Sequence, residues 1–258
     1  MIAIEKPCSE GSDISVPGDK FNYETVPVEP GNLELVQKQV FNIYRNFRTN
    51  PFTAVDRIRE RIKLDGDDES LVGVKVKFAK NENGRKVGFA AYRLKRITVD
   101  DQELLVVDVA SKVIEPRYQN QCIGTRFTRD IVLDEEPDAY TGLTGNPFAY
   151  TANLDTNLFV MPNEEEEYPG FVQRAITRTL GSKSVQVTDL RWGICKDVFP
   201  HEEGVQRFDI SEDKHPLAFK VYSSWLKLGF DPTTFDGKRY WMTVDKSKLP
   251  AKELSAAT

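Results

Sequence analysis

The chain has 258 residues, 40% hydrophobic and 29% charged, an ordinary composition for a globular protein of one large domain or two small ones. It contains no apolar run near the roughly 20 residues that cross a bilayer, and no basic-then-apolar secretory signal at its start. Nucleic-acid binding needs clustered lysine and arginine, which a net charge of −5 disfavours. We therefore expect a cytoplasmic protein with neither a membrane nor a nucleic-acid partner.

The cysteine count indicates a reducing compartment. Three cysteines, Cys8, Cys122 and Cys195, cannot all pair within one chain, and their spacing matches no metal site. Free thiols are the simplest interpretation. No metal cofactor is expected.

The N-terminal part of the chain predicts an arm, a strand and two helices. Residues 1–20 are rich in Ser, Gly, Pro and Asp and form a flexible arm. Residues 21–28 predict a strand. Apolar residues at helical spacing predict a helix from 31 to 50, where Asn-Pro ends it, and a second short helix over 55–62.

Three antiparallel strands are predicted next. Residues 74–78 alternate between apolar and lysine, which is typical of a half-buried strand. The Asn-Glu-Asn-Gly sequence at 81–84 predicts a hairpin turn before a return strand at 86–97. A further turn at 99–101 precedes an apolar strand, 104–114, of the kind buried on both faces.

The remainder of the chain predicts further elements. A helix at 122–132 and a strand at 139–144 come first, and the four glutamates at 164–167 indicate an exposed turn. Mixed strand and turn signals occupy 184–199. Helices are predicted over 171–180 and 216–228, and a closing hairpin over 229–230 and 238–244.

The junction between the apolar strand and the helix at 122–132 carries the main functional signal. A helix start presents unpaired backbone N–H groups and the positive end of the helix dipole, which attract a phosphate or pyrophosphate. Gly124 suits the point where the backbone must pass close to such an anion. Three nearby arginines add positive charge: Arg117, Arg126 and Arg129.

This stretch resembles the acyl-coenzyme-A-binding motif of the GCN5-related N-acetyltransferases (GNAT superfamily). The family motif runs Arg/Gln-x-x-Gly-x-Gly/Ala after a Val-x-Pro-x-Tyr lead-in, and residues 119–124 and 114–118 match it here. One position departs, since Cys122 stands where the family usually has its first glycine. A small side chain with a negative φ would be accommodated there.

The resemblance implies a fold and a domain organisation. The fold class is α/β (α+β), with a mixed, mostly antiparallel central sheet flanked by helices. A single GNAT-like acyltransferase domain is expected over 21–250, with a C-terminal tail at 251–258. The segment Trp225-Leu-Lys-Leu-Gly-Phe230 resembles the family's Tyr-x-x-Leu-Gly-Phe sequence, so 151–215 would be a large insertion after the fifth strand.

The resemblance also implies a cofactor site. The backbone of Val113 and Ile114 would align the pantetheine arm of acetyl-coenzyme A or another acyl-coenzyme A, and the amides of 119–125 would hold the pyrophosphate. Asn146 matches an asparagine that reaches the pantetheine arm, although Asn-Pro is also a plain helix start. The cofactor-binding residues expected are Val113, Ile114, Gln119, Asn120, Gln121, Cys122, Ile123, Gly124, Thr125 and Asn146.

Three residues are candidates for catalysis. Asp108 interrupts an apolar strand, and a carboxylate there is costly unless paired or solvated. It is either a general base or a residue that faces solvent on one side of the sheet or pairs with a neighbouring arginine. The general acid would be Tyr150 or Tyr222, or there is none, since both are also suited to packing a helix on a sheet. His201 and His215 lie in loop-like sequence and are expected at the surface.

Together these features predict an acyl-coenzyme-A-dependent N-acyltransferase that moves acetyl to a primary amine by direct attack. The acceptor would be a small-molecule amine or a protein amine. The alternative is a non-catalytic GNAT-like binding module that contacts a partner through 151–215, which the replacement of glycine by Cys122 favours.

Overall fold

The computed structural model describes residues 20–45, 62, 68–119, 121–144, 167–181, 187–195, 211–213, 216–228, 238–248 and 250. The chain divides into two compact units. Unit 1 comprises the residues up to Leu94 together with Val109–Asp134, and unit 2 comprises Lys95–Asp108 and the residues from Glu135 onward. The strand–turn–helix junction singled out by the sequence lies in unit 1.

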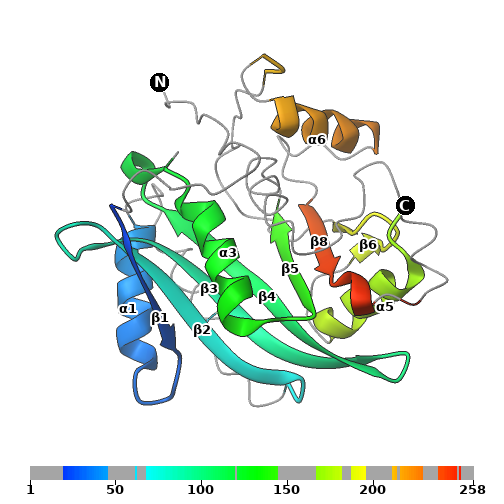
Figure 1. The fold of residues 1–258 in the computed structure, drawn as a ribbon, viewed down its shortest axis with the longest axis horizontal. Helices are drawn as coiled ribbons and strands as arrows, with labels where there is room; N and C mark the ends of the chain where they lie inside the picture. The colour runs from blue at the N-terminus through cyan, green and yellow to red at the C-terminus, as the bar shows by residue number, and fades with distance from the viewer. Residues whose placement is uncertain are drawn as a thin grey trace. The chain divides into compact units, whose positions relative to one another are not determined.

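Four neighbouring strands form the sheet of unit 1, in the order β1–β2–β3–β4 (Figure 1). They are β1 (Asn22–Pro27), β2 (Leu71–Lys80), β3 (Lys86–Val99) and β4 (Gln102–Ile114). β1 pairs antiparallel with β2, with Asn22 opposite Lys80 and Pro27 opposite Lys75. Both β3 and β4 are long enough to continue into unit 2.

Two tight turns connect these strands where the sequence predicts them. Between β2 and β3, the Asn81 side-chain oxygen accepts a hydrogen bond from the Arg85 backbone N–H at 2.9 Å, and Gly84 has a φ of 72°. Between β3 and β4, Asp100 and Asp101 have φ values of 49° and 64°. This left-handed pair matches the twist that a two-residue hairpin turn requires.

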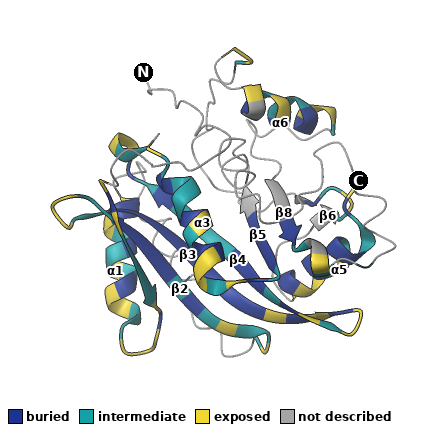
Figure 2. Ribbon diagram, viewed as in Figure 1, coloured by how far each residue is buried: buried dark blue, intermediate teal, exposed yellow. Residues whose placement is uncertain are grey.

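Helices α1 (Leu33–Tyr44) and α3 (Ile123–Glu135) cover opposite faces of the unit 1 strands. The α1 face is apolar and buried (Figure 2): it joins Val36, Val40 and Ile43 of the helix to Val74, Val76, Phe78, Phe89 and Val113 of the strands. Because side chains alternate along a strand, Lys77 points to the other face. There its ammonium group pairs with Asp134 of α3 at 2.7 Å, and Phe127 of α3 packs edge-on against Tyr23 of β1.

The α3 helix joins β4 to β5 (Ala139–Thr144), and β4 and β5 run parallel. The other strand pairs of the two units are mostly antiparallel hairpins or ladders. The predicted fold class, an α/β fold with a mixed, mostly antiparallel sheet flanked by helices, is therefore confirmed.

Unit 2 continues the strand order from β3 and β4 through β5 and β8 to β7 and β6. Its remaining elements are α5 (Gly170–Leu180), β6 (Val187–Asp189), β7 (Ile194–Cys195), α6 (Pro216–Lys227), β8 (Lys238–Val244) and the short helix η2 (Lys246–Lys248). β5 pairs antiparallel with β8, with Ala139 opposite Val244. The core of unit 2 packs α5 against the sheet through Phe171, Val172, Ala175 and Ile176, which contact Ile97, Val106, Ala139 and Met242.

Several predicted elements agree closely with the structure, and others lie outside the described residues. β5 and β8 have the predicted bounds, and α3 begins at 123 where the sequence predicts 122. The predicted helix over 55–62 falls outside the description except for Ile62. The predicted hairpin partner at 229–230, the tail at 251–258 and nearly all of the arm at 1–20 also fall outside it. The domain bounds and the insertion over 151–215 stay predictions.

Within the described part of the chain, the helices lack the combination of length and apolar character that crossing a membrane demands.

Gly88 on β3 permits the close approach of β4. A Cβ atom at this position would lie 3.1 Å from the Val113 carbonyl oxygen and 3.3 Å from Cγ1 of Ile114. The backbone of β4 cannot yield as a flexible side chain can, so Gly88→Ala should lower the free energy of unfolding by about 1–3 kcal/mol. Gly73→Ala on β2 is the matched control, since no described residue places an atom within 4 Å of a Cβ there. Urea unfolding measures both, and equal stabilities would contradict the close contact.

Candidate functional site

The candidate site lies where β4 ends and α3 begins. After Ile114 the chain enters the short helix η1 (Pro116–Tyr118), and α3 starts at Ile123. The backbone N–H of Glu115 donates to the Val87 carbonyl at 2.9 Å, which keeps the end of β4 bonded to β3. The turn therefore begins from a fixed point on the sheet.

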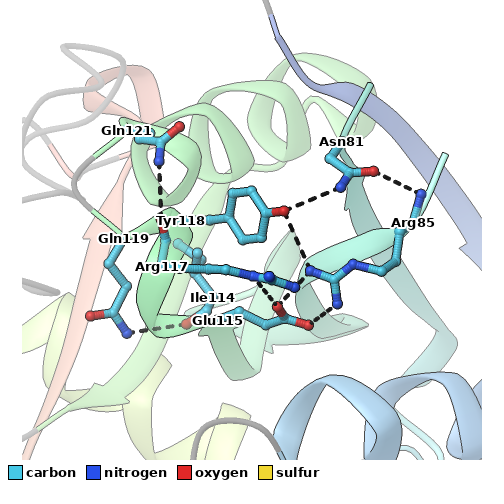
Figure 3. Close-up of polar contacts among 8 residues, drawn as sticks. All are labelled: Asn81, Arg85, Ile114, Glu115, Arg117, Tyr118, Gln119 and Gln121. Atoms are coloured by element: carbon cyan, nitrogen blue, oxygen red, sulfur yellow. Dashed lines mark hydrogen bonds and ion pairs between the residues drawn. The ribbon is translucent and has the colours of Figure 1, made fainter. Parts of the chain in front are cut away.

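An ion pair with a buried carboxylate anchors this turn to the β2–β3 hairpin (Figure 3). The side chain of Glu115 is only 4% exposed, and its two oxygens accept from Nη1 and Nη2 of Arg85 at 2.7 and 2.8 Å. Arg117 Nε adds a longer contact of 3.4 Å. A bidentate guanidinium–carboxylate pair fixes both distance and orientation.

Tyr118 adds a second attachment to the same hairpin. Its hydroxyl accepts from Asn81 Nδ2 at 3.2 Å and from Arg85 Nη2 at 3.4 Å (Figure 3). These hydrogen bonds, with Arg85 the larger cause, lower the pKa of the Tyr118 phenol, and Glu115 raises the pKa of the Arg85 guanidinium. The ring of Tyr118 also packs edge-on against Phe21. The lead-in residues of the motif thus have a structural role here.

Two glutamines of the motif bond to the backbone of the turn. Gln119 Nε2 donates to the Ile114 carbonyl at 3.1 Å, and Gln121 Nε2 donates to the Arg117 carbonyl at 3.3 Å. Both side chains therefore shape the turn. The Ile114 carbonyl retains a second lone pair, since a backbone oxygen accepts two hydrogen bonds.

Cys122 corrects two expectations. Its φ is 56°, in the left-handed region that favours glycine, where a negative φ was expected. The chain thus keeps at this position the kind of backbone conformation that glycine adopts easily. Cys122 is also disulfide-bonded, so the expectation of a free thiol at this position is wrong.

The first turn of α3 offers backbone donors to an anion. The helix begins with the Arg126 N–H bonded to the Cys122 carbonyl at 2.9 Å. By helix geometry, the amides of Ile123, Gly124 and Thr125 precede this bond and have no carbonyl four residues back within the helix. Among the described residues, the one atom within 4 Å of a Cβ at Gly124 would be Cδ1 of Ile114, at 3.7 Å. The fold therefore tolerates a side chain at Gly124.

The arginines expected to add positive charge are largely engaged elsewhere. Arg126 bonds to Asp130 at 2.7 Å and lies over the ring of Tyr23. Arg117 contacts Glu115 and lies over the ring of Tyr118. Arg129 is exposed on α3. In this structure the backbone amides and the helix dipole are the better-placed source of anion attraction.

The side chains at the end of β4 alternate between the two faces of unit 1. Val113 is buried in the core beneath α1, whereas Ile114 lies under Gly124 of α3. Lys112 shares the α3 face, and its ammonium group donates to Thr128 Oγ1 at 2.6 Å. Burial lowers the pKa of Lys112 to about 7.

Of the three predicted catalytic residues, the structure describes Asp108 and Tyr222. Asp108 lies on β4 and is 4% exposed, and Tyr222 is half-buried on α6 of unit 2. Tyr150, Asn120 and Asn146 lie outside the described residues. The assignment of catalytic and cofactor-binding roles therefore stays a prediction.

Sequence reasoning missed several residues that build this site. Asn81 belongs to the predicted turn and Arg85 directly follows it, but their bonds to Tyr118 and Glu115 span 37 and 30 residues of sequence. Lys112 could have been recognised as a charged residue within the apolar run 104–114, which is how Asp108 was identified.

Similarity to known proteins is found among solved structures. No family model and no curated protein matches the chain. Among solved structures, the chain is similar to a GNAT family N-acetyltransferase of Escherichia coli in complex with coenzyme A, with 14% identity and a TM-score of 0.37 over 63% of this chain and 81% of the other.

Two further solved structures are similar to this chain. A spermidine N-acetyltransferase of Vibrio cholerae has 14% identity and a TM-score of 0.35 over 57% of this chain and 85% of its own. A GNAT family acetyltransferase of Brucella melitensis in complex with acetyl-coenzyme A has 12% identity and a TM-score of 0.33 over 48% and 76%.

Loss of the ion pair between Arg85 and the buried Glu115 should destabilise the protein. Glu115→Gln keeps the side-chain shape but turns an amide N–H₂ group toward the Arg85 guanidinium, so the free energy of unfolding should fall by about 1–3 kcal/mol in urea unfolding. Glu103→Gln is the matched control, because Glu103 and its partner Arg96 are 68% and 62% exposed and lie 3.6 Å apart. That variant should remain within about 0.5 kcal/mol of the original chain. Equal losses in the two variants would contradict an anchoring role for Glu115.

Proposed function

We propose that this chain is an acyl-coenzyme-A-dependent N-acyltransferase, which transfers acetyl from acetyl-coenzyme A to a primary amine. The observation that carries the proposal is the junction of β4 and α3, where a left-handed residue at Cys122 leads into a helix whose second residue, Gly124, has no side chain. This geometry suits an anionic group that approaches the backbone closely.

The pyrophosphate of coenzyme A would lie against the first turn of α3. The amides of Ile123, Gly124 and Thr125 point along the helix axis, and the helix dipole adds a partial positive charge at the same point. The Glu115–Arg85 pair and Tyr118 hold the preceding turn to the sheet. A rigid turn lowers the conformational entropy lost when the ligand binds.

The pantetheine arm would run beside the end of β4. Its amide groups would bond to the backbone of Val113 and Ile114, and the second lone pair of the Ile114 carbonyl remains suited to this after Gln119 has donated to the first. Gly88 keeps β3 and β4 close here, so the strand end is held in place from the neighbouring strand.

The reaction would be a direct acyl transfer. The amine nitrogen attacks the thioester carbonyl carbon, the new C–N bond forms, the C–S bond breaks, and the coenzyme A thiolate takes up a proton. Asp108 is the proposed general base that removes a proton from the amine. Tyr150 and Tyr222 are the proposed alternatives for the proton donor, and Asn146 the proposed further contact to pantetheine.

Binding of coenzyme A tests the proposal directly. In isothermal titration calorimetry the original chain should bind acetyl-coenzyme A, and Gly124→Val should bind it at least tenfold more weakly, because the branched side chain obstructs the amides of the helix start. Leu133→Val places the same residue in the same helix at an exposed position and should leave the affinity unchanged.

Circular dichroism should show that both variants are folded, since in the described part of the chain a Cβ at Gly124 would meet a side-chain atom of Ile114, at 3.7 Å, and no backbone atom within 4 Å. No binding by the original chain would refute the proposed cofactor and favour the alternative, a GNAT-like binding module. Binding that Gly124→Val leaves intact would place the pyrophosphate elsewhere.

The role of Asp108 is tested by turnover, once a screen of small amines, amino acids and peptides with thiol-release detection has found an acceptor. Asp108→Asn should reduce turnover by roughly 10²–10⁴ with little change in coenzyme A affinity. Asp134→Asn is a control carboxylate, paired with Lys77 at 2.7 Å on α3. It should keep its turnover per folded molecule. A fully active Asp108→Asn protein would exclude this carboxylate as the base.

A further inference from the structure

Cys122 lies at the point where the backbone turns into α3. Its φ of 56° is in the left-handed region, which a residue with a side chain adopts only at a cost in free energy. Its carbonyl accepts the first hydrogen bond of α3, from the Arg126 N–H at 2.9 Å. The conformation of Cys122 therefore sets the direction in which the amides of Ile123, Gly124 and Thr125 point.

The residue at this position combines a strained backbone with a breakable bond. A glycine would adopt the same conformation without a side-chain penalty. The chain has instead a cysteine whose sulfur is disulfide-bonded, with Cys8 or Cys195 as the other cysteines of the chain. A disulfide differs from glycine because a thiol reductant breaks it and an oxidant restores it. The backbone at the start of α3 is therefore linked to the redox state of the Cys122 sulfur.

Non-covalent contacts hold the rest of this turn. Tyr118 bonds to Asn81 of the β2–β3 hairpin at 3.2 Å. After it, the side chains of Gln119 and Gln121 donate to backbone carbonyls at 3.1 and 3.3 Å. Side-chain hydrogen bonds near solvent compete with water, so each restrains the following backbone only weakly. Breaking the disulfide would therefore let Cys122 return to the negative φ that residues with a side chain prefer.

We propose that the disulfide of Cys122 is a redox switch, which favours coenzyme A binding when oxidised and weakens it when reduced. This inference rests on the proposed function, because it requires the pyrophosphate at the first turn of α3. In the oxidised protein the left-handed residue orients the amides of α3 before the ligand arrives. In the reduced protein that arrangement is only one of several, so the apparent affinity falls with its population.

The switching reaction is a thiol–disulfide exchange with a dithiol as the reductant. One thiolate of the dithiol attacks a protein sulfur, the S–S bond of Cys122 breaks, and a mixed disulfide forms. The second thiol of the reductant then displaces the protein sulfur. Two electrons and two protons pass to the protein, both protein sulfurs become thiols, and the dithiol closes into its own disulfide. A disulfide oxidant reverses the reaction.

Titration calorimetry with acetyl-coenzyme A measures the switch. The chain is titrated in its oxidised form and after reduction with a water-soluble phosphine, which is removed before the titration under inert gas. The reduced chain should bind about five- to tenfold more weakly, because residues other than glycine seldom populate the left-handed conformation. Cys122→Gly should bind more tightly than Cys122→Ala, since glycine adopts this conformation readily. Neither variant should respond to reduction.

Amide hydrogen exchange gives a second readout that needs no ligand. In the ligand-free chain, reduction should speed exchange at residues 121–126 and leave exchange in β2 unchanged. Cys8→Ser and Cys195→Ser supply matched controls. Peptide mapping without reductant identifies which of the two bonds to Cys122. Replacing that partner should weaken binding as reduction does, whereas the other variant should keep the full response to reduction.

The outcomes separate the switch from the cofactor site. Equal or tighter binding by the reduced chain would overturn the switch and leave the cofactor site standing. A response to reduction that survives in Cys122→Gly would overturn the role of Cys122, because that variant has no sulfur at this position. No binding of acetyl-coenzyme A by either the oxidised or the reduced chain would overturn both the switch and the proposed function.

Discussion

The bond between Glu115 and Arg85 is the constraint on which the candidate site depends. A carboxylate buried to this degree is stable only with a partner, and the guanidinium from the β2–β3 hairpin occupies both of its oxygens. The bond fixes Glu115, which directly follows β4. Three residues later, Tyr118 bonds to Asn81 of the same β2–β3 hairpin. The short helix η1 is thus held at both ends, and the chain enters α3 in a defined direction.

Close backbone approach is the second constraint. Gly88 brings β3 against the backbone at the end of β4, and Ile114 in turn lies beneath Gly124. Because Gly88 has no side chain, β3 approaches the backbone of β4 more closely than a larger residue would permit. A strand end beside a helix start is thereby held rigidly, which is the arrangement that an elongated ligand with a charged end requires.

Local patterns predicted most of the secondary structure, because alternation and helical spacing depend on neighbours in sequence. The bounds of β5 and the start of α3 follow from such patterns, as do the turn residues Asp100 and Asp101. The contacts that hold the site depend on pairs distant in sequence, such as Arg85 with Glu115, which no local pattern specifies. Lys112 was detectable as a charge in an apolar run, but its bond to Thr128 requires the packing of α3.

Cys122 shows why a single departure from a motif has to be judged by its backbone. A side chain in the left-handed region costs about 1 kcal/mol that glycine avoids, so glycine would satisfy this turn at lower cost. The backbone conformation that glycine favours persists here with cysteine, and the sulfur is disulfide-bonded. The disulfide bond is therefore what Cys122 provides and a glycine cannot. Because the Cys122 carbonyl accepts the first hydrogen bond of α3, a covalent restraint on Cys122 acts at the start of the helix whose amides would bind the anion.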